Sequence, residues 1–493
     1  MRRKFLTNLI LLVFLNLLVK TYWVFHIDIG VQNEVGTSEY GFYFAIFNFA
    51  FIFQILLDMG ITNYNNRTIA QNNHLLSKHF SSIIILRFLF AIIYGAVILG
   101  IGYSMNYSPR QMQMLTIIGF NQFLLSLILY LRSNISALLL FKVDSFISVL
   151  DRLLMIAICV VLLNGDVLDG DFKIEYFVYA QTAAYAITAF LAFAFLVRRT
   201  KLKSLNWSMP FFLMIIKKSM PYALLIFFMG LYSRIDSVLI DYLLLDDGKL
   251  QAGIYASAFR LFDAANNMSG LLFAGLLLPI FAKLIKEKSD LSQLVKLSFT
   301  LLFLLSTAVA TVSYFYGEAI IKLLYHQHAK ESLIAYNLRI EESGDILKIL
   351  MGVFVFTSTT YIFGTLLTAN GSLRKLNVIA FIGVVISLIL NLALIPLLQA
   401  QGAAWANLSA QGITAILQVY IAFRILPIKF DIIFLFRMFF FVFITIVLSW
   451  VSLQIPIHWI GKISILGISI IGLAFALQLL NVKTFLNIIQ NEK

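Results

Sequence analysis

The sequence predicts an all-α polytopic membrane protein with about 14 transmembrane helices, and three observations lead to this fold class. Of its 493 residues, 61% are hydrophobic and 12% are charged, whereas soluble domains carry roughly 25% charged residues. Apolar segments of about 20 residues, the length that crosses a bilayer, recur along the whole chain. Lysine and arginine gather in alternate loops. The single cysteine, Cys159, excludes an intramolecular disulfide.

The apolar segments predict fourteen spans, and the basic residues predict their orientation. The spans are expected at 5–27, 40–58, 80–103, 112–135, 145–164, 174–197, 217–241, 253–282, 294–316, 347–368, 376–397, 402–424, 433–453 and 459–480. With a cytoplasmic N-terminus, 21 lysines and arginines lie in cytoplasmic segments and 7 on the other side. This asymmetry favours an even number of spans with both termini in the cytoplasm, and it explains the net charge of +13 without nucleic acid.

The most basic loop, 198–218, follows the sixth span and divides the chain. We expect an N-terminal lobe at 1–200, a cytoplasmic linker at 201–218, a C-terminal lobe at 219–425 and two appended spans with a tail at 426–493. The lobes show a weak internal repeat. Lys20 precedes Gly41-x-Tyr43 by 21 residues, and Arg234 precedes Gly253-x-Tyr255 by 19. Parallel repeats of this kind are typical of transporters.

Arg234 lies within the seventh span, where an isolated charge is costly. Insertion of a central arginine costs roughly 2.5 to 3.5 kcal/mol, so the side chain is expected to face a polar cavity or a partner. Asp236 is two residues further on, and helix geometry therefore places it on a different face. The alternative is that Arg234 only forms a structural ion pair.

Polar residues at helical spacing mark two other spans. Asn16, Lys20 and Trp23 share a face of the first span, and the eighth span carries a stripe of four residues, namely Arg260, Asp263, Asn267 and Gly270. A surplus of deep cations suits an anionic head group, because arginine binds phosphate through paired hydrogen bonds and lysine through a point charge. The expected cavity cations are Lys20, Arg87, Arg234 and Arg260, and the expected supporting residues are Asn16, Asp58, Asp236, Asp263 and Asn267.

Arg132 and Arg152 lie near span ends, where snorkelling of the long side chain to the membrane surface explains them.

No catalytic constellation or phosphate-binding glycine loop occurs, so we expect no cofactor and no catalytic residue. The segment 317–345 is expected to be the longest outer loop. His326 and His328 within it could bind a metal, but a solvated loop is the favoured interpretation, and no metal site is expected.

Several motifs resemble the polysaccharide-transporter branch of the multidrug/oligosaccharidyl-lipid/polysaccharide exporter (MOP) superfamily, which includes O-antigen and capsule repeat-unit flippases. They are Asn8 with the basic N-terminus, Glu39-Tyr-Gly41-x-Tyr43, Leu57-Asp58-Met-Gly60, Tyr232-Ser-Arg234-Ile-Asp236, Gly253-x-Tyr255-x-x-Ala258-x-Arg260, Ala369-Asn-Gly371, Asn391-x-x-Leu-Ile-Pro396 and Gly402-Ala-Ala. The resemblance implies two six-helix lobes in a V around a central cavity, two further C-terminal helices, and alternating access. It also implies an undecaprenyl-diphosphate-linked oligosaccharide as substrate, the bacterial inner membrane as location, and polymerases or glycosyltransferases as partners.

Three alternatives remain. Peptidoglycan-precursor flippases usually carry several arginines in the first two spans, where this chain offers only Lys20. Drug/cation antiporters need acidic residues in the N-terminal lobe, and a cationic cavity would repel their substrates. A membrane-embedded polysaccharide polymerase or acyltransferase would need a catalytic set at a membrane face, which only 317–345 could supply.

Overall fold

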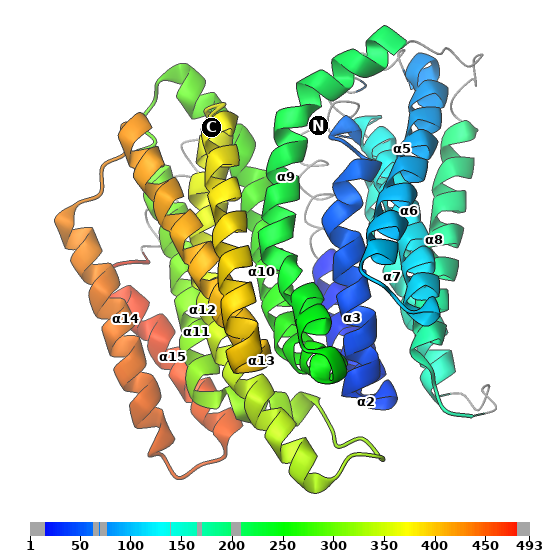
Figure 1. Ribbon diagram of the computed structural model, residues 1–493. Helices are drawn as coiled ribbons and strands as arrows, with labels where there is room; N and C mark the ends of the chain where they lie inside the picture. Colours follow the sequence, from blue (N-terminus) through cyan, green and yellow to red (C-terminus); the bar gives the residue numbers. More distant parts are fainter. Residues whose placement is uncertain are drawn as a thin grey trace. The chain divides into compact units, whose positions relative to one another are not determined.

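The computed structural model describes residues 15–62, 69, 76–138, 140–164, 170–198 and 209–480, and these contain helices and no strand. In chain order the elements are η1 (Trp23–Asp28), α2 (Ile29–Val35), α3 (Thr37–Ile52), η2 (Phe53–Leu57), α5 (Leu76–Ser104), α6 (Pro109–Ala137), α7 (Phe141–Asn164), α8 (Ile174–Val197), α9 (Met209–Leu243), η4 (Leu245–Asp247), α10 (Gly248–Glu287), α11 (Ser292–Leu324), α12 (Leu333–Ala369), α13 (Leu373–Ile425), α14 (Ile432–Leu453) and α15 (Trp459–Ala476) (Figure 1).

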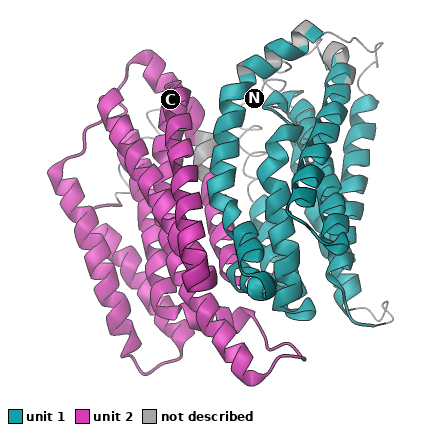
Figure 2. Cartoon of the chain, viewed as in Figure 1, with its two compact units in different colours: residues 1–256 teal, residues 257–493 magenta. Residues whose placement is uncertain are grey.

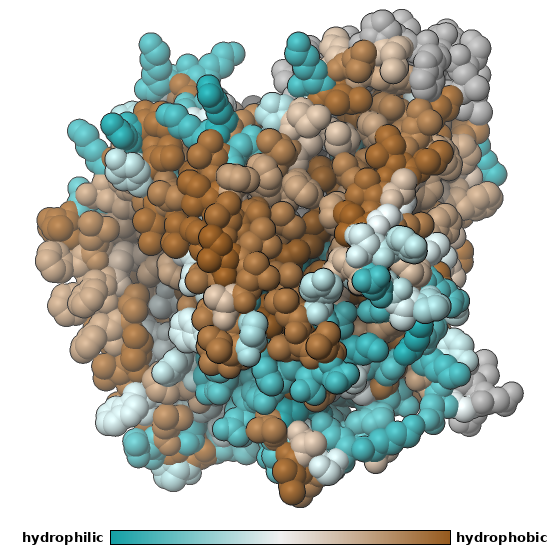
Figure 3. All heavy atoms as spheres, in the orientation of Figure 1, coloured by the Kyte–Doolittle hydropathy of each residue, from teal (hydrophilic) through white to brown (hydrophobic). Residues whose placement is uncertain are grey.

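The helices confirm the predicted membrane fold. Within the described residues, 11 helices are long and apolar enough to cross a membrane. One of them, α13, covers two expected spans, because the chain breaks at Gln399 (φ 53°, ψ −135°) between 376–397 and 402–424. Helix α10 covers the expected span 253–282. The first fourteen residues, which include Asn8, lie outside the described part. Apolar side chains cover the middle of the helices, and hydrophilic ones gather near helix ends (Figure 3).

Two compact units make up the chain, Met1–Ala256 and Ser257–Lys493 (Figure 2). In the first unit, α3 packs against α6 and α9, and α6 packs against α7 and α8. Part of its core is a cluster that includes Phe80, Leu131 and Leu196. Helix α9 begins at Met209, so residues 209–218, which we expected in a linker, are helical. The expected four-part division of the chain stays a prediction.

The second unit contains most of α10 and all of α11 to α15. Helix α12 packs against α11 on one side and α13 on the other. Helices α14 and α15 pack against α11 through an apolar cluster that includes Tyr316, Phe441 and Ile470. The polar Tyr316 hydroxyl shares a hydrogen bond of 2.6 Å with Ser452 Oγ on α14. The two C-terminal helices are therefore attached to the unit mainly through α11.

The prediction of a loop over 317–345 is wrong, because α11 continues to Leu324 and α12 begins at Leu333. At about 1.5 Å per residue, the 37 residues of α12 extend roughly 55 Å, well beyond a hydrocarbon core of about 30 Å. Arg339 stabilises the short connection between α11 and α12 by donating hydrogen bonds to both carboxylate oxygens of Glu331, at 2.8 and 2.9 Å. Burial by itself raises the pKa of Glu331. The hydrogen bonds and positive charge of Arg339 and the hydrogen bond from the His328 N–H outweigh burial, so the pKa of Glu331 lies below its ordinary value.

The connections at the two ends of α11 allow a direct test of topology. We expect a cysteine at Ser332 to react with an impermeant maleimide from outside the cell, and a cysteine at Ser289 to react only after the membrane is opened. Both positions are exposed, and Cys159→Ala removes the only native thiol. The reverse labelling pattern would contradict the orientation derived from the basic residues.

Candidate functional site

Arg234 lies on α9 beside α3 and is half-buried. Its Nη1 donates a hydrogen bond of 3.1 Å to Asn48 Oδ1, and its guanidinium lies over the Phe51 ring at 4.4 Å. Asn48 in turn donates to Ser237 Oγ at 2.9 Å. The amide and the ring, both from α3, thus hold the guanidinium in place within the helical part of the first unit.

Asp236 contacts a different helix, as expected for a residue two positions from Arg234. Its side chain is buried, with the residue 1% exposed, and Oδ2 accepts a hydrogen bond of 2.7 Å from the Tyr255 hydroxyl on α10. Asp236 therefore links α9 to the start of α10, while Arg234 contacts α3.

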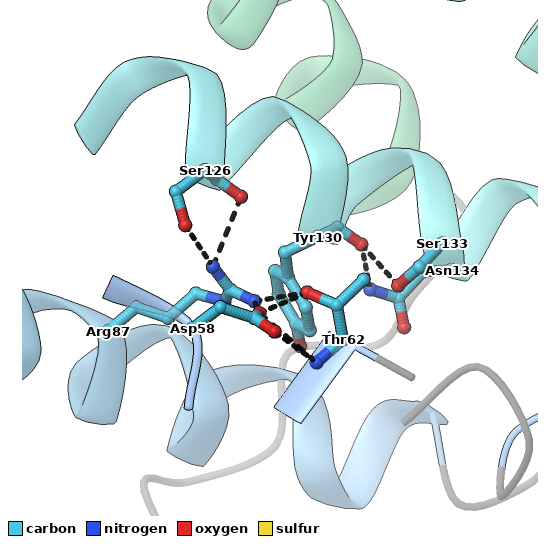
Figure 4. Close-up of polar contacts among 7 residues, drawn as sticks. All are labelled: Asp58, Thr62, Arg87, Ser126, Tyr130, Ser133 and Asn134. Carbon is cyan, nitrogen blue, oxygen red and sulfur yellow. Dashed lines mark hydrogen bonds and ion pairs between the residues drawn. The ribbon is translucent and has the colours of Figure 1, made fainter. Parts of the chain in front are cut away.

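Arg87 is placed in a dense polar network rather than at an open surface (Figure 4). The residue is 1% exposed. Nη1 donates to Ser126 Oγ at 2.8 Å, and Nη2 donates to Thr62 Oγ1 at 2.5 Å and forms an ion pair with Asp58. The guanidinium also lies over the Tyr130 ring at 4.6 Å. This placement gives Arg87 and Asp58 a structural role, and the expected roles of Arg87 as a binding cation and of Asp58 as a supporting residue stay predictions.

Lys20 is the most open of the expected cations in the first unit. It is exposed, and within the described residues no hydrogen bond or ion pair of its ammonium group is found. Arg152, Asp151 and Arg132 lie within electrostatic range of it. An ammonium is too costly to leave in hydrocarbon, so this surface of the helix calls for polar surroundings.

Arg132 and Arg152 are not the snorkelling residues that their positions near span ends predicted. Arg132 Nε donates to Asp144 Oδ1 at 2.9 Å, and Arg152 Nε lies 3.8 Å from Asp151 Oδ2. The Arg152 guanidinium also lies 5.2 Å from the centre of the Trp23 ring. A signal for this arrangement was present, because Asp144 and Asp151 are seven residues apart and so share a face of α7.

The helix that carries Lys20 contains a π-helical segment, Trp23–Asp28, before α2. Asn16 on this helix donates to Ser148 Oγ on α7 at 2.9 Å. Asp28, 3% exposed, accepts a hydrogen bond of 2.7 Å from the Tyr40 hydroxyl. Segments of π-helix are frequent at functional sites. The helix also continues to Val35 rather than ending near Ile27, so Lys20 lies farther from its end than the sequence predicted.

The polar stripe of α10 belongs to the second unit. Arg260 and Asp263 are half-buried and Asn267 is exposed. Gly270 lies against Tyr361 of α12, since an added Cβ would come within 2.9 Å of the tyrosine hydroxyl. The shared cavity that we expected for Lys20, Arg234 and Arg260 stays a prediction. Within the described residues no group of three or more metal-ligating side chains occurs.

A protein-family model matches the sequence of this chain. The family model described as "Polysaccharide biosynthesis protein" matches residues 27–285, just over half of the chain. No curated protein matched in sequence.

Solved structures share the fold at low sequence identity. A lipid II flippase MurJ in an inward closed conformation aligns with a TM-score of 0.66 at 12% identity, over 95% of this chain and 96% of that chain. An inward-facing MATE multidrug resistance transporter of the MOP superfamily aligns with a TM-score of 0.64 at 12% identity, over 84% and 97%. A MOP superfamily transporter from Pyrococcus furiosus aligns with a TM-score of 0.54 at 12% identity, over 85% and 95%. Matched over residues 27–285 and built on the fold of these transporters, the chain belongs to the polysaccharide biosynthesis protein family.

Proposed function

We propose that this protein flips an undecaprenyl-diphosphate-linked oligosaccharide, such as an O-antigen, capsule or exopolysaccharide repeat unit, from the cytoplasmic to the outer leaflet of the bacterial inner membrane. The observation that carries the proposal is the pair of cations Lys20 and Arg234 on membrane helices of the first unit. Lys20 is exposed, and Arg234 is half-buried and oriented by Asn48 and Phe51. Membership of the polysaccharide biosynthesis family supports a saccharide as the cargo.

The chemistry of the cargo explains the need for these groups. A diphosphate and several sugars cannot cross hydrocarbon without hydrogen-bonding partners, whereas the polyprenyl tail can remain in the lipid. Guanidinium donates paired hydrogen bonds to phosphate, and ammonium supplies a compact charge. With the inside negative, moving two negative charges outward is favourable by about 4.6 kcal/mol per 100 mV. The membrane potential therefore supplies a driving force for flipping.

The residues around Lys20 shape the local charge. Arg132 and Arg152 are each next to a carboxylate of α7, so their charges are largely balanced. Asp28 also lies within electrostatic range of Arg152, and Lys20 is the exposed cation of this cluster. Alternating access would carry the bound head group from one leaflet to the other. In this mechanism the protein makes and breaks no covalent bond, and polymerases or glycosyltransferases would act before or after it.

The leaflet in which the lipid-linked repeat unit accumulates tests the proposal. Cells that lack the protein should accumulate the lipid-linked repeat unit in the cytoplasmic leaflet, where a periplasmic glycosidase cannot reach it, and re-expression should clear it. Repeat units that accumulate singly in the outer leaflet would instead indicate a polymerase. Accumulation of the peptidoglycan precursor would identify a different saccharide as cargo.

A further inference from the structure

The start of α10 lies directly against α3, with no side chain between the two backbones. A Cβ added at Gly41 would lie 1.9 Å from the Lys249 carbonyl oxygen and 2.5 Å from Gly253 N. A Cβ added at Gly253 would lie 2.0 Å from the Thr37 carbonyl oxygen. Side chains do not tolerate such distances, so this crossing requires glycine on both helices. Figure 1 shows α2, α3 and the start of α10 together at one end of the first unit.

Two of the side-chain contacts beside the crossing are weak. Gln32 Nε2 donates to the Gly253 carbonyl oxygen at 3.1 Å, although that oxygen lies inside a helix. The Lys249 ammonium lies 5.5 Å from the centre of the Phe42 ring. One neutral hydrogen bond and one cation–π contact can be broken and remade readily. The two backbones therefore fit tightly at the crossing, and these two side-chain contacts add little to hold it closed.

The two glycines occupy the same position in the two copies of the internal repeat. Gly41 opens Gly41-x-Tyr43 in the first copy, and Gly253 opens Gly253-x-Tyr255 in the second. Each follows the connection after the intramembrane cation of its copy, on the side expected to be outside from the basic residues. Equivalent elements of parallel repeats meet at the repeat interface, and this is where transporters hold their substrates.

We propose that the Gly41–Gly253 crossing is the outer gate of the transport pathway, that it is closed in this structure, and that opening to the outside separates the first turns of α10 from α3. This inference rests on the proposed transport function. Two glycines allow the backbones to meet and exclude water without a large apolar plug, while the weak contacts of Gln32 and Lys249 allow release. The Tyr255–Asp236 hydrogen bond would let α9 follow α10 as the gate opens.

Cysteine accessibility tests the gate without any substrate. Ala45 lies one turn deeper than Gly41 on the same face of α3 and is 1% exposed. A cysteine at Ala45, in a Cys159→Ala background, should react slowly with an impermeant maleimide added outside. Adding Gly41→Ala should raise the labelling rate several-fold, because the added methyl group prevents closure. The control Gly30→Ala, where nothing lies within 4 Å, should leave the rate unchanged.

A second variant covers the case in which Gly41→Ala fails to accumulate. Gln32→Ala combined with Lys249→Ala removes the Gln32–Gly253 hydrogen bond and the Lys249–Phe42 contact and adds no atoms, so it should also raise the labelling rate at normal protein level. Unchanged labelling of both variants, or of the double variant alone if Gly41→Ala is absent, would overturn the gate. The variants could label faster while cells that lack the protein accumulate no lipid-linked saccharide. That result would support the gate and reject the proposed cargo.

Discussion

Arg234→Ala should reach the membrane at a near-normal level and transport little or no lipid-linked saccharide. The guanidinium is held by Asn48 at 3.1 Å and by the Phe51 ring, so its position is set by α3 and its removal leaves these partners in place. If it binds a diphosphate, the loss of paired, charge-assisted hydrogen bonds removes one of the strongest contacts available to the cargo. Accumulation of the cytoplasmic intermediate at matched protein abundance measures the effect.

A substitution that keeps the charge of Arg234 but changes its shape distinguishes a role in binding from a role in structure. Arg234→Lys keeps the charge but not the paired donors, so it should retain part of the transport. Lys217→Ala, at an exposed position of the same helix, serves as the matched control and should transport normally. If Arg234 instead served only as the partner of a carboxylate, Arg234→Ala would be depleted from the membrane and a second substitution of that carboxylate would restore it. Normal transport by abundant Arg234→Ala would remove the residue from the site.

Arg87→Ala should lower the free energy of unfolding by about 3 kcal/mol, the lower end of the range for breaking a buried pair. The lower end applies because the Asp58 side chain is 25% exposed, whereas that of Arg87 is 2% exposed. The variant also leaves Ser126 without its guanidinium donor. Protein abundance in the membrane and the thermal unfolding temperature of the purified protein are the measurements.

Two companion variants make the interpretation specific. Asp58→Asn introduced into Arg87→Ala should recover part of the lost stability, because no unpaired carboxylate then remains. Arg424→Ala, at an exposed arginine of α13, should leave the unfolding temperature unchanged. An Arg87→Ala protein that is as stable as the wild type and yet fails to transport would return Arg87 to the binding site that the sequence predicted.

Hydropathy predicted the order of the membrane helices because its signal is local. A segment such as 433–453 is apolar enough to span wherever the rest of the chain lies, and the structure forms α14 there. Hydropathy does not say where a helix stops once it has left the hydrocarbon. The segment 317–345 was therefore predicted as a loop, although α11 and α12 occupy most of it.

Roles of single charges depended on partners that are distant in sequence. Asp58 and Arg87 are 29 residues apart, and no spacing rule predicts that the two side chains meet. Arg152 lies next to Asp151 in sequence, but only the fold places Trp23 against its guanidinium. A position near the end of a span was thus compatible both with snorkelling and with an interior ion pair, and tertiary packing selected the second.

By itself the sequence determined a polytopic membrane protein, the intramembrane cations and the repeated Gly-x-Tyr motif, since each is visible within a window of one or two helices. Only the tertiary structure decided that Gly41 and Gly253 touch through their backbones and that Arg87 is enclosed. The physical reason is that burial in lipid depends on the residues of one helix, whereas contact between helices depends on the shapes and donors of both.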